Sequence, residues 1–268
     1  MSKNRKHLIW NSIIGLLLAG VLTASYILGS DKRKGTLCNK IDITVEDSLT
    51  TPYLQSETIR QYLSEDYGKL IGLQMDAIDL RKIESILNAK GGILKSEAYV
   101  TNDGSLSINV RQRKPIIRFQ TDSYGFYCDR YGFLLPLREN FSCQALLIEG
   151  SIPIDLTDCC KGRPTDSADS LWLEDILKVA ELINSNPIWK DKIAQIHHNE
   201  SGELSIKPKD GQEIFLLGDM TDIQEKFEKM QIYYEMISPV REEGIYDVVD
   251  LRYTKQIVCR NKEQENKK

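Results

Sequence analysis

Three groups of residues in this chain could do chemistry: a histidine pair, two nearby carboxylates and six cysteines. His197 and His198 are neighbours on an expected strand, so their side chains point to opposite faces and cannot bind one metal ion together. A surface position for this pair is the favoured interpretation, because no further ligand follows nearby. Asp247 and Asp250, three residues apart on another strand, also face opposite sides and make a poor acid–base pair. No catalytic residue and no metal ligand is therefore assigned.

The sequence also lacks the short motifs of several common enzyme classes. It contains no Gly-x-Ser-x-Gly elbow, no Walker loop and no dinucleotide-binding fingerprint. We therefore expect a protein that is not an enzyme, without cofactors and without a small-molecule substrate.

The cysteines are Cys38, Cys128, Cys143, Cys159, Cys160 and Cys259. No Cys-x-x-Cys pair occurs, and the adjacent Cys159 and Cys160 do not fit the loop geometry of a zinc site. In an oxidising compartment a disulfide is feasible, and Cys128–Cys143 is the pairing we would expect. An equally good interpretation is that several cysteines are buried as small hydrophobic side chains.

The elements that position these residues fall into two groups, and the first is a small α+β domain. A helix begins at Ser56, and a second begins after Asp79, a favourable N-cap, and ends at Gly91 and Gly92. Pro115 is expected to end the last strand, because proline lacks a backbone donor. The predicted order is strand, helix, helix, strand, strand, at residues 41–45, 56–63, 80–90, 98–100 and 106–110.

The second group is richer in strands. A hairpin is expected around residues 129–132, and residues 155–170 are expected to form a loop. The last strand is expected over 246–253, with one interpretation extending it to Cys259, and the charged tail from Arg260 is expected to be disordered. Further strands are expected at 145–149, 193–197, 204–207 and 213–217, with helices over 170–184 and from Asp222.

The N-terminus carries an apolar run that could anchor the chain in a membrane. Residues 8–28 contain no charge, and about 21 residues are enough to cross a bilayer as a helix. Trp10 and Tyr26 lie near its ends, where aromatic rings suit the lipid interface. A cleaved signal peptide is disfavoured, since the run exceeds the usual ~7–15 apolar residues and no Ala-x-Ala site follows. A lipoprotein modified at Cys38 is disfavoured because Leu37 precedes that cysteine.

Charge is distributed unevenly along the chain. The first 34 residues carry six basic side chains and one acidic one, so the remainder has a net charge of −9 within the chain total of −4. An acidic body without a basic patch argues against nucleic-acid binding.

Four segments resemble the bacterial cell-division family FtsQ/DivIB in its Bacteroidetes-type form. The terminal Val-Asp-Leu-Arg-Tyr strand is the most specific of them, and the similarity covers nearly the whole chain in order. The first segment is similar to the end of a POTRA module closing on an Arg-x-Pro element, and the second to an aromatic-Asp-x-x-Gly hairpin. The segments are residues 83–116, 126–137, 214–218 and 249–253.

This resemblance implies a non-catalytic divisome scaffold that binds FtsB-like and FtsL-like bitopic proteins. A partner segment would add a strand to the C-terminal sheet edge. Arg252 and Tyr253 would be the anchors, with backbone supplied by Thr254, Lys255, Gln256 and Ile257. The alternative is that Leu251 and Tyr253 are core residues and Arg252 is solvated. The resemblance does not explain the cysteines or the acidic Glu242–Glu243 pair.

The expected fold is α+β: one transmembrane helix, a POTRA-like β-α-α-β-β domain, and a mostly antiparallel β domain with flanking helices. The protein would sit in the bacterial inner membrane at the division septum, with its bulk in the periplasm. Two other functions compete: a POTRA-type accessory protein for polypeptide transport and, less favoured, a membrane-tethered enzyme. The expected segments are a cytoplasmic tail 1–7, the membrane helix 8–29, the POTRA-like region 30–119, the β domain 120–260 and a tail 261–268.

Overall fold

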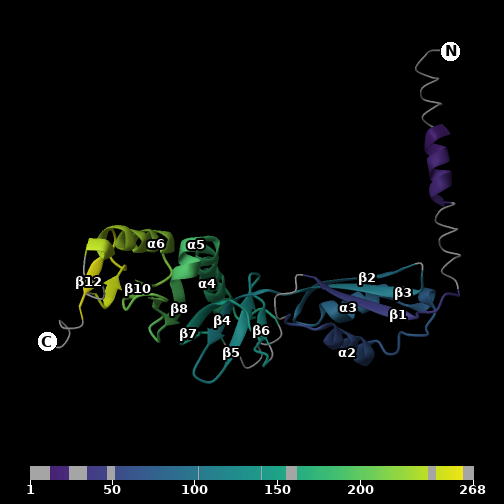
Figure 1. Ribbon diagram of the computed structural model, residues 1–268, viewed down its shortest axis with the longest axis horizontal. Coiled ribbons are helices and arrows are strands. Elements are labelled where there is room, and N and C mark those ends of the chain that lie inside the picture. Colours follow the sequence, from purple (N-terminus) through teal and green to yellow (C-terminus); the bar gives the residue numbers. More distant parts are fainter. Residues whose placement is uncertain are drawn as a thin grey trace, which may run out of the picture. The chain divides into compact units, whose positions relative to one another are not determined.

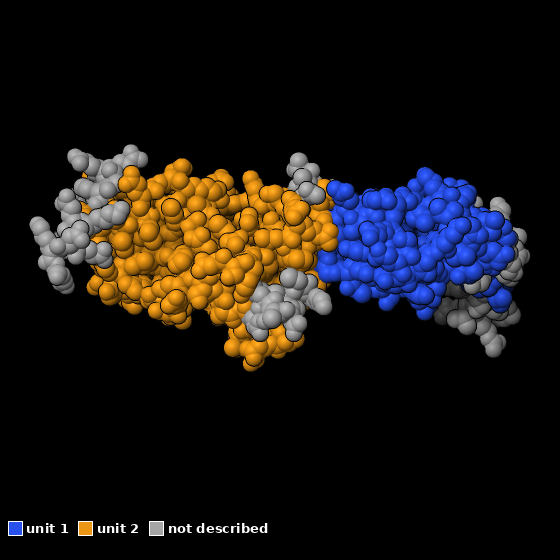
Figure 2. Space-filling model, turned by 90° about the horizontal axis from the view of Figure 1, so that it is seen from below, with its two compact units in different colours: residues 1–48, 54–112 blue, residues 49–53, 113–268 orange. Residues whose placement is uncertain are grey.

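The computed structural model describes residues 13–23, 35–46, 52–101, 103–139, 141–154, 162–240 and 246–261. The chain divides into two compact units, coloured separately in Figure 2. Unit 1 comprises residues 1–48 and 54–112, and unit 2 comprises residues 49–53 and 113–268. This division lies ahead of the expected boundary at residue 119, because the strand beginning at Pro115 belongs to the sheet of unit 2.

Residues 13–23 form a helix with exposed side chains. Among the described residues, no helix has both the length and the apolar character needed to span a bilayer. Residues 8–12 and 24–29 of the expected membrane helix lie outside the described residues, as do the expected tail 1–7 and most of the C-terminal tail. The anchor therefore stays a prediction.

Unit 1 has the predicted order of strand, two helices and two strands (Figure 1). Its sheet has the order β1-β3-β2, with β1 parallel and β2 antiparallel to the central β3. A short 3₁₀ turn, Met75–Ala77, precedes the second helix. The elements are β1 Lys40–Glu46, α2 Ser56–Asp66, α3 Leu80–Asn88, β2 Ile93–Val100 and β3 Ser105–Gln112.

Local sequence signals account for these elements. The side chain of Asp79 accepts a hydrogen bond from the backbone N–H of Lys82 at 3.0 Å, the predicted N-cap of α3, which is worth about 1 kcal/mol. Ile83 and Leu87 then recur one turn apart and are completely buried. On β3 the alternating apolar side chains of Leu106, Ile108 and Val110 are also completely buried.

Unit 2 is built on a nine-stranded mixed sheet in the order β12-β11-β10-β9-β8-β7-β4-β5-β6. Five strand pairs are antiparallel, and the pairs β4–β7, β7–β8 and β10–β11 are parallel. The predicted mostly antiparallel domain with flanking helices is therefore confirmed. The strands are β4 Pro115–Gln120, β5 Gly125–Asp129, β6 Leu134–Pro136, β7 Leu146–Gly150, β8 Ile193–His198, β9 Leu204–Pro208, β10 Ile214–Gly218, β11 Val248–Asp250 and β12 Val258–Arg260.

Three helices accompany this sheet and lie on the same side of it in Figure 1. They are α4 Ser167–Ser185, α5 Pro187–Lys192 and α6 Ile223–Ile232, and a π-helical turn, Tyr233–Ile237, continues α6. Ile176 of α4, Phe227 of α6 and Phe215 of β10 belong to one hydrophobic core. The two longer helices were predicted. The short α5 was not, although Asn186 caps it and Pro187 occupies its first position.

Strand β4 is a correction to the sequence interpretation. Pro115 does follow the end of β3, but it also begins β4, which lies between β7 and β5. Its pairing with β5 shifts register between Pro115 and Ile117. A proline is tolerated at the first residue of a strand and at such an irregularity, because no ladder donor is required there.

The end of the chain is a second correction. A single strand over 246–253 was expected, yet β11 ends at Asp250 and β12 returns antiparallel to it, with Val249 opposite Cys259. Residues 251–257, which we call the C-terminal loop, connect the two strands. Lys255 adopts a left-handed conformation with φ of 57°, which permits the turn without a glycine.

The histidine pair is a third correction, since the expected surface position is wrong for His198. His197 is exposed, whereas His198 is buried, with its Nδ1 hydrogen-bonded to the carbonyl of Ser151. The indole N–H of Trp172 donates to His198 Nε2 at 3.4 Å. Burial lowers the pKa of His198, and a neutral ring with one donor and one acceptor nitrogen fits both contacts.

The expected Cys128–Cys143 disulfide is wrong as well. Cys38, Cys128, Cys143 and Cys259 are free thiols, and Cys159 and Cys160 lie outside the described residues. Cys128 is completely buried in the core of unit 2, and burial raises the pKa of its thiol. The alternative interpretation, a buried small hydrophobic residue, therefore holds for Cys128.

Candidate functional site

The six residues predicted to bind a partner lie together in the C-terminal loop. Arg252 to Gln256 are exposed and Ile257 is half-buried. They do not form an edge strand, because the loop turns between β11 and β12. Since β12 is the edge strand at this end of the sheet order, an incoming strand near the loop would pair with β12 and not with the loop itself.

Asp250 fastens the start of the loop. Its carboxylate is completely buried and accepts hydrogen bonds from Arg252, at 2.9 Å from Nε and 2.8 Å from Nη2. Arg260 on β12 donates to the same carboxylate at 2.7 Å, so one buried acid binds both limbs of the hairpin. Burial alone would raise the pKa of Asp250, but the hydrogen bonds and charges of the two arginines outweigh it and hold that pKa below its usual range.

The guanidinium of Arg252 is therefore engaged by carboxylates of the same chain. Its third nitrogen, Nη1, donates to the carboxylate of Glu203 at 3.0 Å, in the loop before β9. The hydrogen bonds to Asp250 and then Glu203 raise the pKa of the Arg252 guanidinium. The geometry makes Arg252 a residue that positions the loop.

Helix α6 holds the same loop through a buried lysine. Lys229 is only 7% exposed, and its ammonium donates to the backbone carbonyls of Leu251 and Tyr253, each at 2.9 Å. Glu225, one turn earlier, lies 3.3 Å from Lys229 Nζ and accepts the N–H of Lys255, also at 3.3 Å. The N–H of Lys255 and then Lys229 lower the pKa of Glu225.

A second buried lysine, Lys226, marks the other side of this region. Its ammonium donates to the carbonyl and the carboxylate of Asp219, both at 2.9 Å. The Thr221 hydroxyl and then Lys226 lower the pKa of Asp219 to about 2. Both lysines fall at inward positions of α6, beside Phe227 and Met230. A charged residue at the spacing of an apolar stripe was the sequence signal for these contacts, and it was overlooked.

This network fixes the backbone of the C-terminal loop and leaves the side chain of Tyr253 outside. Tyr253 is 49% exposed, although its carbonyl is held by Lys229. The alternative that Tyr253 is a core residue is therefore wrong, whereas Leu251 is indeed completely buried. An aromatic ring on a rigid backbone is a typical anchor for a protein partner, because little entropy is lost on binding.

Comparisons with known proteins bear on this arrangement. Residues 36–111 match a family model described as a POTRA-like domain, and residues 114–260 match one described as "FtsQ/DivIB, C-terminal related". The second match covers more than half of the chain and includes the whole C-terminal hairpin. The chain belongs to the FtsQ/DivIB C-terminal related family. A search of curated proteins finds no match.

The FtsQ/DivIB resemblance drawn from the sequence is thus confirmed, and its hairpin motif is structural. Asp129 accepts the N–H groups of Tyr131 and Phe133 at 2.8 and 2.9 Å and pairs with Arg113 at 2.7 Å. Gly132 has φ of 76°, and a β-carbon added there would contact Leu173 of α4 at 3.4 Å. The motif therefore shapes a tight turn against α4.

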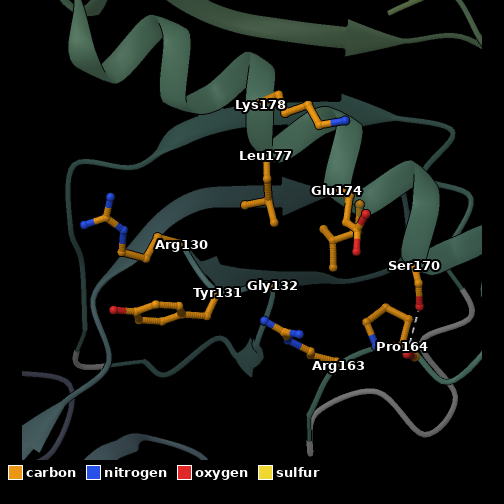
Figure 3. A pocket seen from close by; sticks show the side chains of 10 residues that line it. Arg130, Tyr131, Gly132, Arg163, Pro164, Ser170, Glu174, Leu177 and Lys178 are labelled. Atoms are coloured by element: carbon orange, nitrogen blue, oxygen red, sulfur yellow. Dashed lines mark hydrogen bonds between the residues drawn. The ribbon is translucent and has the colours of Figure 1, made fainter.

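A groove of about 420 Å³ lies between this turn and α4 (Figure 3). Tyr131 and Arg130 border one side, and Glu174 and Lys178 lie on α4. The hydroxyl of Ser170 donates to the carbonyl of Pro164 at 3.1 Å, which closes the far end. In the part of the chain that the structure describes, no three His, Cys, Asp or Glu side chains gather as a metal site would require.

Proposed function

We propose that this chain is a non-catalytic scaffold of the bacterial division machinery that binds other division proteins through its C-terminal hairpin. The proposal is supported by the family match over residues 114–260. The observation that carries it is the C-terminal loop itself, whose backbone is fixed by Lys229 and Asp250 while Tyr253 stays exposed. A surface prepared in this way suits a protein partner better than a small molecule.

The proposed partners are FtsB-like and FtsL-like bitopic proteins. A partner segment would add to the outer edge of β12 by backbone hydrogen bonds, while Tyr253 packs against its side chains. Thr254 to Ile257 would supply further contacts from the loop. Arg252 holds the loop through Asp250 and Glu203, and its role is therefore to position Tyr253.

The proposed location is the inner membrane at the division septum. Residues 8–29 would form the single membrane helix, with the short basic leader in the cytoplasm and the chain from residue 30 onward in the periplasm. The support is the uncharged apolar run together with the family of the folded part.

The test is binding of the full chain, reconstituted in nanodiscs, to the periplasmic segments of the FtsB-like and FtsL-like proteins. Tyr253→Glu places a charge in the proposed contact, and Tyr131→Glu is the matched control. The two tyrosines are 49% and 50% exposed, and Tyr131 lies in the β5–β6 turn at the opposite end of the sheet order. Neither change alters the core.

We expect Tyr253→Glu to weaken binding by more than about tenfold, as for a central aromatic anchor, and Tyr131→Glu to leave it unchanged. Loss of binding in both variants would place the contact elsewhere. Failure of the unchanged chain to bind would contradict the proposed function itself.

A further inference from the structure

The end of the unit 1 sheet at which the chain enters β1 carries an exposed aliphatic surface. Leu37 is 52% exposed, Ile71 48% and Leu73 38%. They belong to two segments, residues 36–38 and 70–75, which we call the aliphatic tip. Each of these side chains would be expected inside a domain, because exposing it to water costs on the order of 1 kcal/mol or more.

Backbone hydrogen bonds join the two segments of the aliphatic tip. The N–H of Cys38 donates to the carbonyl of Leu73 and the N–H of Gly72 to the carbonyl of Cys38, both at 2.8 Å. The N–H of Met75 donates to the carbonyl of Thr36 at 2.9 Å. Cys38, Leu70 and Met75 are buried between the exposed side chains. The backbone therefore holds Leu37, Ile71 and Leu73 at the surface.

This exposure is concentrated at one place. Among the described residues 35–112 of unit 1, the large hydrophobic side chains that are exposed are these three and Tyr99. Tyr99 has a polar hydroxyl and is common at surfaces, so every exposed large aliphatic residue in that range lies at the aliphatic tip. A cluster of this kind marks a contact with something apolar.

The chain itself indicates what that contact is. Eight residues lie between Leu28, the end of the apolar run, and Leu37, and the fully extended chain from Leu28 to Leu37 spans at most about 30 Å. If the run crosses a bilayer, the aliphatic tip is thereby confined near its surface. In the intervening sequence Lys32, Arg33 and Lys34 outnumber Asp31, which favours anionic lipid headgroups. Beside the tip itself the exposed Lys69 and Asp76 balance one another.

We propose that the aliphatic tip inserts Leu37, Ile71 and Leu73 into the membrane interface and so fixes the orientation of unit 1 on the bilayer. This inference rests on the proposed membrane anchor. Aliphatic side chains in the acyl boundary, flanked by basic residues at headgroup level, are the usual composition of an interfacial contact.

The experiment uses the full chain in vesicles of phosphatidylethanolamine and phosphatidylglycerol with radiolabelled acyl chains. Benzoylphenylalanine replaces Ile71 in one variant and Lys95 in the control. Lys95 is exposed on β2. In the strand register it lies opposite Arg111 of β3, which in turn lies opposite Glu46 at the end of β1. Lys95 is therefore at the end of the sheet away from the aliphatic tip. Illumination links the label to whatever it contacts.

We expect about tenfold more lipid adduct from position 71 than from position 95. In a second variant the label replaces Leu37, and adding Ile71→Ser with Leu73→Ser should reduce its lipid adduct several-fold. A chain that stays in the membrane on carbonate extraction, yet gives equal adducts at 71 and 95, overturns the aliphatic tip and leaves the anchor intact. So does an adduct at 71 with protein only. A chain released by carbonate contradicts the anchor, and the tip proposal fails with it.

Discussion

Replacing Lys229 with methionine is expected to free the C-terminal loop without disturbing the sheet beneath it. Methionine keeps much of the buried aliphatic stem and removes the ammonium, which donates to the carbonyls of Leu251 and Tyr253 at 2.9 Å. Each hydrogen bond from a charged group is worth about 1.5–3 kcal/mol. Relief of the buried charge offsets part of that loss.

We therefore expect Lys229→Met to lower the free energy of unfolding of unit 2 by about 2 kcal/mol, because one of the two carbonyls is buried and left unpaired. For a domain of this size that corresponds to a fall in Tm of about 4–8 °C. Calorimetry of the full chain measures the fall, and hydrogen exchange measures the opening of residues 251–257.

Lys226→Met is the matched control, since Lys226 is equally buried on the same helix but donates to Asp219. It should lower stability without accelerating exchange in the C-terminal loop. Equal exchange in both variants, or no acceleration in Lys229→Met, would refute the role of Lys229 in holding the loop.

Two further predictions concern buried ionisable groups in unit 2. Asp250→Asn removes the acid shared by Arg252 and Arg260, and because both arginines can reach water we expect a loss of about 2–3 kcal/mol in chemical denaturation. Folding lowers the pKa of Asp250, so its contribution to the stability of unit 2 is present above about pH 4 and is lost as the pH falls below that value. If Asp250→Asn lost stability at acidic pH as steeply as the unchanged chain, this role of Asp250 would be contradicted. Burial lowers the pKa of His198, so unit 2 should lose stability as the pH falls below about 6.5. His198→Gln should flatten that dependence and His197→Gln should not, as urea unfolding at several pH values will show.

Unit 1 could be predicted well from the sequence because its signals are local. The cap at Asp79 and the helical spacing of Ile83 and Leu87 identify α3 within one short window. The alternation of Leu106 and Ile108 does the same for β3. Each element is specified by its own residues, so the order of elements follows directly.

The C-terminal hairpin was not predicted because its turn contains no residue type that is typical of turns. The segment contains neither glycine nor asparagine at its bend, and Lys255 takes the left-handed conformation. The bend is stabilised by Lys229 and Asp250, and the partners of Lys229 lie 22 and 24 residues away. The sequence therefore identified the right stretch for a candidate site, but only the tertiary contacts show how it is presented.

His198 and β4 show the same limit. From the local sequence His198, beside His197, is expected at the surface. Its burial depends on Trp172, 26 residues earlier, whose indole N–H donates to His198 Nε2. From the local sequence Pro115 is expected to end a strand. In the sheet it is instead the first residue of β4, at a register shift against β5. In each case a distant partner reverses the local expectation.

The central claim, that division proteins bind at the C-terminal hairpin, is tested most directly by hydrogen exchange of the full chain with and without the FtsB-like and FtsL-like segments. A strand added to β12 would pair amides that face outward, so protection should rise at Val258–Arg260 and in the C-terminal loop. Protection confined to unit 1 or to the β5–β6 edge, with the hairpin unchanged, would contradict the account.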